Sequence, residues 1–173
     1  MAAQPIKYWS TEIDATKSAS ELMALLVQYG ATSTSIEWDG LGQPTGISFK
    51  IMDPRRGLLP VRLRARTDAV VELLRRQVQF KRGNRQEWEQ GLRARATRII
   101  WRHLRDLVEQ QMLAIRIGQY ELAEMFMHGV EVQTPDGRKG TLGEWVTTAL
   151  VSGAVGRVDS GALLLPPAAP EGL

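Results

Sequence analysis

Apolar residues in the first third of the chain change from the period of a helix to that of strands. From about Ala15 to Tyr29 they recur at the spacing of one helix face, and Gly30 follows in the position of a C-cap glycine. Asp14 and the hydroxyl residues after it offer N-cap side chains for this helix. Residues Ile6–Ser10 give a weaker indication of a short strand before it.

Three runs then alternate between apolar and polar residues, which predicts strands with one apolar face. They are Ser35–Trp38, Ile47–Met52 and Val61–Arg66, and turn sequences at Asp39–Gly40 and Asp53–Gly57 connect them. We expect a three-stranded antiparallel meander. Its apolar face needs a cover, which the helices before and after it in the sequence are expected to supply.

A helical pattern returns after the third strand and continues, with one interruption, to about residue 117. Its first helix, about Asp68–Val78, is followed by the basic segment 80–85, where Gly83 and Asn84 break the pattern. A long helix from Gln86 to Ile117 then carries a wide apolar stripe.

The last part of the chain predicts a small unit of helices and one hairpin. A short helix at Tyr120–Met127 precedes a hairpin at Glu131–Gly140 with a Pro-Asp-Gly turn. Thr141 and Glu144 have the spacing of a capping box at the start of a final helix, Leu142–Leu150. Residues 151–173 are rich in Gly, Ala and Pro, so we expect a mobile or loosely docked tail.

Together these elements predict an α+β fold, in which a three-stranded antiparallel meander flanked by helices precedes a long helix and a small helical and hairpin C-terminal unit. We divide the chain into an α/β-meander domain at 1–79, a basic linker at 80–85, a helical unit at 86–150 and a tail at 151–173. The length of 173 residues, with 43% hydrophobic and 24% charged residues, is typical of one globular domain with or without an appended helical unit.

Composition excludes several classes of protein. The chain has no cysteine, so it contains no disulfide, no thiolate nucleophile and no cysteine-based metal site. No stretch has the length and apolarity of a signal-peptide core or a membrane helix. We therefore expect a cytoplasmic protein without a membrane partner.

Charge is distributed unevenly along the chain, although the formal net charge is only +3. The segment Arg55–Arg105 contains 15 basic and four acidic residues, a net charge of +11, whereas the two flanks together carry −8. A basic segment of this size is typical of proteins that bind a polyanion, most often nucleic acid.

Arginines alternate with apolar residues in the third predicted strand. Strand geometry places Arg62, Arg64 and Arg66 on one face about 6.7 Å apart, which is comparable to the phosphate spacing of an extended nucleic-acid strand. Lys50 is expected beside them on the neighbouring strand. Guanidinium groups bind phosphate oxygens and stack on bases. The alternative is the solvated face of a half-buried sheet, balanced by Glu37.

Two further basic clusters follow this strand. On the long helix, Arg93, Arg95 and Arg98 have no acidic residue among the four residues that follow each of them, so we expect them to contact nucleic acid. Ion pairs at four-residue spacing are instead expected for Arg102 with Asp106 and for Arg105 with Glu109.

The second cluster is the basic linker with the end of the helix before it. Lys81, Arg82 and Arg85 follow Arg75 and Arg76, and five cations exceed what the helix C-terminus requires. We expect the three linker residues to contact nucleic acid as well.

Tryptophans offer stacking surfaces for unpaired bases. Trp38 and Trp101 lie on or beside apolar faces, so we expect them in the core. Trp88 lies between polar and acidic residues and is expected to be partly exposed.

Catalytic residues are not indicated. The histidines, His103 and His128, have no serine or cysteine nucleophile motif to serve. Acidic residues near the strand ends stand where turns use aspartate, and the glycines of the first hairpin precede a strand instead of a phosphate-binding helix. We therefore expect no enzyme activity, no metal and no cofactor.

Three stretches resemble a recurring pattern in uncharacterised small proteins of bacteriophages and other bacterial mobile elements. They are Ala19–Ala31, Gly46–Phe49 and Trp101–Gln111, and the resemblance spans residues 8–148. It implies a phage or mobile-element context and no established activity.

Two known architectures share part of the predicted order of elements. The order of a helix, three strands and a helix is similar to that of a double-stranded-RNA-binding domain. In that family the second helix starts with a Lys-rich, Gly-containing sequence. Here the corresponding residues, Thr67–Glu72, are Thr-Asp-Ala-Val-Val-Glu, so that feature is absent. The meander followed by a helix also resembles, in topology only, the core of single-strand annealing proteins, which form rings or filaments on DNA along a basic groove.

We therefore expect a non-enzymatic, homo-oligomeric protein that binds nucleic acid, with single-stranded DNA favoured and annealing in recombination as its role. The alternative is a structural or interaction protein that self-assembles through Ile99, Leu107 and Met112 of the long helix, without a nucleic-acid role.

Overall fold

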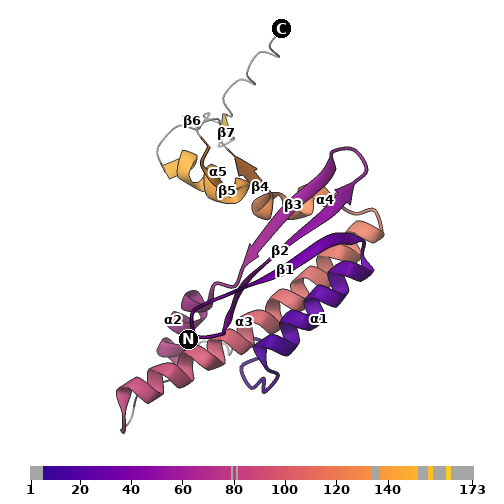
Figure 1. The fold of residues 1–173 in the computed structure, drawn as a ribbon. Coiled ribbons are helices and arrows are strands. Elements are labelled where there is room, and N and C mark those ends of the chain that lie inside the picture. Colours follow the sequence, from indigo (N-terminus) through magenta and orange to yellow (C-terminus); the bar gives the residue numbers. More distant parts are fainter. Residues whose placement is uncertain are drawn as a thin grey trace.

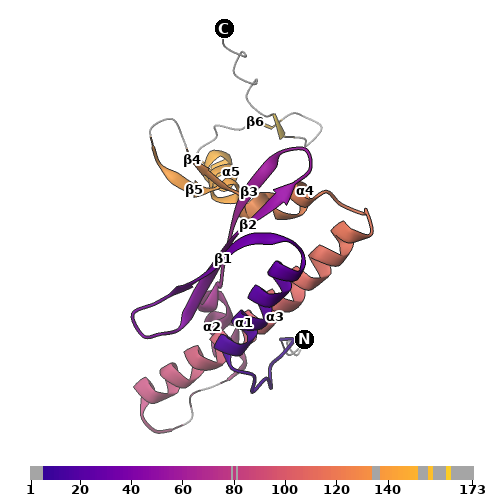
Figure 2. The same ribbon diagram turned by 45° about the vertical axis from the view of Figure 1, so that its right-hand side comes forward.

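A three-stranded antiparallel sheet packed against two helices forms the centre of the computed structural model (Figure 1). The structure describes residues 6–78, 80, 82–133, 137–151, 156–157 and 163–164. Helices α1 (Ala15–Gln28) and α3 (Arg85–Arg116) lie side by side on one face of the sheet (Figures 1 and 2). Helix α2 (Thr67–Gln77) lies beside the first part of α3. The predicted α+β fold is confirmed.

The segment before the sheet contains one predicted element that is present and one that is not. Helix α1 begins after its N-cap residue Asp14 and ends at Gln28, close to the predicted bounds. The prediction of a short strand at Ile6–Ser10 is wrong. Residues 7–10 form a turn, in which the Trp9 amide donates to the carbonyl oxygen of Ile6 at 3.0 Å.

The sheet has the strand order β1-β2-β3, with both pairs antiparallel. Its strands are β1 (Ala31–Trp38), β2 (Pro44–Asp53) and β3 (Gly57–Arg64). The meander and the alternation of its two faces are therefore confirmed. The inward-facing residues of β2 and β3 are buried: Ile47, Phe49, Ile51, Val61 and Leu63.

Trp38 departs from the predicted core. Its side chain is 49% exposed, although Ile36 on the same strand packs against the core. The pairing register shifts between Glu37 and Trp38, so that Ile36 pairs with Ile47 but Trp38 pairs with Pro44. Such a bulge changes the alternation of side chains between the two faces, which a regular strand pattern does not anticipate.

The second helix that covers the sheet is α3, so the expectation that α2 would do so is wrong. Only two residues connect β3 to α2, which leaves α2 beyond the end of the sheet (Figure 1). Trp101 of α3 is fully buried, as predicted, and its Nε1 donates to the carbonyl oxygen of Pro44 at 2.8 Å. Val70, Val71 and Leu74 of α2 form a second cluster with Leu92, Ala96 and Ile99 of α3.

One hydrophobic core joins residues from 1–79 and 86–150, the two ranges that the sequence patterns set apart. It includes α1, the sheet, and the second half of α3 with Trp101, Leu104, Val108 and Met112. Of the three side chains expected at a self-assembly surface of the long helix, Ile99 and Met112 are each 2% exposed, and Leu107 is 37% exposed. None of the helices in the described ranges combines the length and apolarity needed to cross a membrane.

The C-terminal unit lies against β3 (Figure 2). It contains α4 (Leu122–Phe126), the 3-10 helix η1 (Met127–Gly129), and the paired strands β4 (Glu131–Gln133) and β5 (Lys139–Thr141). Its helix α5 (Leu142–Val151) begins with the predicted capping box, which is confirmed: Glu144 accepts from the Thr141 amide, and the Thr141 hydroxyl accepts from the Glu144 amide.

The predicted tail, 151–173, lies outside the described residues except for Val151 and two short paired strands. These are β6 (Gly156–Arg157) and β7 (Leu163–Leu164).

Candidate nucleic-acid interface

Folding pairs much of the basic segment with carboxylates. Of the 15 basic residues between Arg55 and Arg105, the structure describes all except Lys81, and eight of them lie within ion-pair distance of a carboxylate. Many of these carboxylates belong to the acidic flanks of the sequence. The uneven distribution of charge along the sequence therefore reflects, in part, ion pairs that form within the folded chain. The eight residues are Arg55, Arg56, Arg62, Arg64, Arg75, Arg93, Arg102 and Arg105.

Arg62 of the predicted strand row is held by Glu37. Its Nε and one Nη each donate to a different carboxylate oxygen of Glu37 at 2.6 Å, and the Ser48 hydroxyl donates to the same carboxylate at 3.2 Å. The hydrogen bond from Arg62 holds the pKa of the Glu37 carboxyl below its usual value, against the opposing effect of burial. Both side chains are about one-third exposed. The expectation that Glu37 balances the charge of this row is thus met by a bidentate ion pair between Glu37 and Arg62.

The other members of the row differ from one another. Arg64 pairs with Glu144 of α5 at 2.8 Å, and the Thr141 amide and the charge of Arg64 both lower the pKa of the Glu144 carboxyl. Arg66 lies outside the strand, because β3 ends at Arg64, and it is the exposed N-cap residue of α2. Lys50 is exposed on β2, on the same face as Arg62.

One cleft of about 540 Å³ between β3 and the C-terminal unit is lined by all three arginines of the row. Glu144, Thr147 and Thr148 of α5 also line it. The structure thus brings Arg62, Arg64 and Arg66 together, but the first two already have carboxylate partners.

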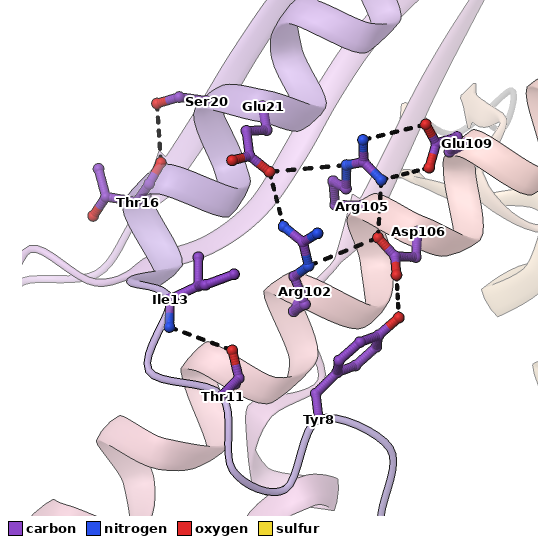
Figure 3. A network of polar contacts seen from close by, with 10 residues as sticks. All are labelled: Tyr8, Thr11, Ile13, Thr16, Ser20, Glu21, Arg102, Arg105, Asp106 and Glu109. Atoms are coloured by element: carbon purple, nitrogen blue, oxygen red, sulfur yellow. Dashed lines mark hydrogen bonds and ion pairs between the residues drawn. The ribbon is translucent and has the colours of Figure 1, made fainter.

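A polar network surrounds Arg102 and Arg105 of α3 (Figure 3). The predicted pairs of Arg102 with Asp106 and of Arg105 with Glu109 are both present. Glu21 of α1 also pairs with Arg102 at 2.9 Å.

Tyr8 joins the same network from the N-terminal segment by donating its hydroxyl to Asp106 (Figure 3). Burial alone would raise the pKa of the Asp106 carboxyl, but the bonds from Tyr8 and Arg105 outweigh it, and the pKa is lowered. These contacts join α1, α3 and the N-terminal segment, so the arginines of this network have a structural role.

Arg93, Arg95 and Arg98 of α3 were expected to be free to contact nucleic acid, but they meet partners from other segments or are partly covered. Arg93 pairs with Asp68 of α2 at 2.6 Å. Arg95 donates from Nε to the Trp9 carbonyl oxygen at 3.0 Å and stacks 4.0 Å from the centre of the Trp9 ring. Arg98 is half-buried.

Exposed cations without a carboxylate partner lie among the described residues at the junction of α2 and α3. Arg76, Arg82 and Arg85 are exposed, and none of them forms an ion pair with another residue that the structure describes. We call these three residues the basic tip. Lys81, the fourth predicted cation here, lies outside the described residues.

Two aromatic side chains lie beside the basic tip. Phe80 and Trp88 are in edge-to-face contact, with ring centroids 5.5 Å apart and planes at 61°. Phe80 is 39% exposed and Trp88 is half-buried, as predicted for Trp88. Both line a cavity of about 660 Å³, together with Arg75, Val78, Arg85 and Glu89.

No related protein was identified. Comparison with protein-family models, curated proteins and solved structures found no match.

Metal-binding side chains do not gather in the part of the chain that the structure describes. It contains no group of three or more His, Asp or Glu side chains able to hold a metal ion. His103 and His128 are both exposed. The Asp106 carboxylate, three residues after His103, bonds instead to Tyr8 and Arg105.

Sequence reasoning missed Phe80, which it treated as part of the linker. The available signal was an aromatic residue within a run of cations, since Arg75–Arg85 contains five basic residues and no acidic one. Aromatic side chains among basic residues are typical of surfaces that bind single strands. The partners Glu144 and Asp68 were missed because no local pattern relates them to Arg64 and Arg93.

Proposed function

We propose that the protein is a non-enzymatic nucleic-acid-binding protein whose principal phosphate contacts are Arg76, Arg82 and Arg85 at the basic tip. The observation that supports this most strongly is the exposure of these three guanidinium groups without a carboxylate partner among the described residues. A guanidinium group donates two parallel hydrogen bonds to a phosphate, and its charge remains in place at any physiological pH.

The strand row is a weaker candidate for the same role. A phosphate that approaches Arg62 must compete with two hydrogen bonds of 2.6 Å to Glu37, and one that approaches Arg64 must compete with Glu144. Exchange of one anion for another offers little net gain in free energy. Lys50 and Arg66 are exposed and serve as secondary contacts.

A salt titration tests this proposal. Fluorescence polarisation of labelled single-stranded DNA, duplex DNA and RNA is measured at several salt concentrations, for the native chain and for Arg76→Ala/Arg82→Ala/Arg85→Ala. Each phosphate contact contributes about 0.7–0.9 to the slope of log affinity against log salt, so the triple variant should lose about 2–3 from that slope.

The matched control is Lys17→Ala/Arg116→Ala/Lys139→Ala, which removes the same charge from exposed positions outside the basic tip. It should bind almost as well as the native chain. Absence of binding, binding that is indifferent to salt, or equal losses in the two triple variants would each overturn the proposal.

A further inference from the structure

We infer that the cavity beside the basic tip binds an unpaired base, stacked on Phe80 and Trp88, and that the protein therefore favours single strands over duplexes. This inference rests on the proposed function, because it names the form of nucleic acid that the same site takes. Single-strand binders commonly combine cations along the backbone with aromatic rings on which bases stack.

The arrangement of the two rings leaves part of the Phe80 side chain uncovered. Phe80 and Trp88 meet edge to face at 61°, so they do not cover each other as two parallel rings would. Both rings line the cavity, and 39% of Phe80 remains exposed in the folded chain. An exposed aromatic face gains contact area when a planar ligand stacks on it.

The size and charge of the cavity suit a nucleotide. Its volume of about 660 Å³ lies within the usual range for small-ligand sites. Arg85 is part of the lining, so a phosphate attached to a stacked base meets a cation at the same place. Arg75 also lines the cavity, where Glu72 and Glu89 hold its guanidinium group.

A duplex cannot use this site without losing stacking and pairing. In a duplex both faces of each base are covered by neighbouring bases, so a base must leave the stack to reach Phe80. A single strand presents its bases at much lower cost. The basic tip, by contrast, attracts the phosphates of either form.

Phe80 is the side chain to change in a test, because Trp88 also packs against the cluster between α2 and α3. Replacing Trp88 would alter binding and packing together. Phe80→Leu keeps an apolar residue and removes the ring. Tyr120→Leu is the matched control, since Tyr120 is an aromatic residue elsewhere on the surface and is 47% exposed.

The experiment compares oligothymidine with an abasic oligomer of equal length, which has the same phosphates and no bases, and with a duplex. Polarisation titrations use the native chain, Phe80→Leu and Tyr120→Leu. We expect oligothymidine to bind the native chain about tenfold more tightly than the abasic oligomer. Phe80→Leu should remove most of that difference, with an unchanged salt slope, and Tyr120→Leu should preserve it.

The outcomes that would overturn the inference differ from the outcome that would overturn the proposed function. If the native chain binds both oligomers equally, or if Phe80→Leu preserves the difference, base stacking at this cavity is wrong while salt-dependent phosphate binding stands. If no oligomer binds the native chain, the proposed function is wrong and the inference with it.

Discussion

Loss of one carboxylate charge on the open face of the sheet should destabilise the fold in a way that depends on pH. The change is Glu37→Gln, which keeps the size of the side chain and removes the ion pair between β1 and β3. In the native chain the Arg62 guanidinium donates two bonds of 2.6 Å to this carboxylate, and Ser48 donates a third of 3.2 Å.

The magnitude follows from the exposure and geometry of this pair. Exposed ion pairs contribute about 0.2–1 kcal/mol to the free energy of unfolding, and hydrogen bonds to charged groups about 1.5–3 kcal/mol. Both side chains are about one-third exposed, and the pair is bidentate. The amide of the variant still accepts one bond from Arg62. We therefore expect a loss of about 1 kcal/mol near neutral pH.

The direction of the pH dependence follows from the pKa of Glu37, which the bond from Arg62 lowers. A carboxyl whose pKa is lowered in the folded state stabilises the fold at pH values above its ordinary pKa. That contribution disappears as the pH falls through the lowered folded-state pKa. The difference between the native chain and Glu37→Gln should therefore shrink towards zero in acid.

Urea denaturation followed by circular dichroism, at pH values from neutral to acidic, measures this difference. Glu72→Gln is the matched control, because Glu72 is 60% exposed and its partner Arg75 keeps a second carboxylate, Glu89. It should have no measurable effect. Equal losses in the two variants at neutral pH, or a loss in Glu37→Gln that persists undiminished in acid, would refute this reasoning.

Two further predictions concern the contacts that fix α3 and the C-terminal unit. Trp101→Phe removes the hydrogen bond to the buried carbonyl oxygen of Pro44 and leaves a void in the core. It should lower the free energy of unfolding by about 2–3 kcal/mol. Trp145→Phe, at a position that is 54% exposed, should lower it by less than about 0.5 kcal/mol. Gly129→Ala places a Cβ 2.8 Å from the carbonyl oxygen of Arg62, so urea denaturation should show a loss of about 1–3 kcal/mol, and an unchanged stability would contradict the close approach of η1 to β3.

Elements with local causes were predictable from the sequence. Helix α1 follows from apolar spacing and an aspartate N-cap, and the alternation in Ile47–Met52 identifies the buried face of β2. The capping box of Thr141 and Glu144 and the pair of Arg102 with Asp106 depend on residues three or four positions apart. Such patterns are visible in sequence because the backbone geometry of one element fixes the distances involved.

Features that depend on distant segments were settled by the tertiary structure. A bulge exposes Trp38, and a two-residue connection leaves α2 beyond the sheet, so α3 covers the sheet instead. No local pattern specifies either result.

The same distinction applies to the candidate site. The basic segment was evident from composition. Which of its arginines pair with carboxylates was not evident, because Arg62 meets Glu37 across 25 residues and Arg102 meets Glu21 across 81. Ion pairs depend on distance in space, and chain folding sets that distance. The sequence therefore determined that the protein is rich in arginine between residues 55 and 105, and the tertiary structure decided that the basic tip keeps exposed cations beside two aromatic rings.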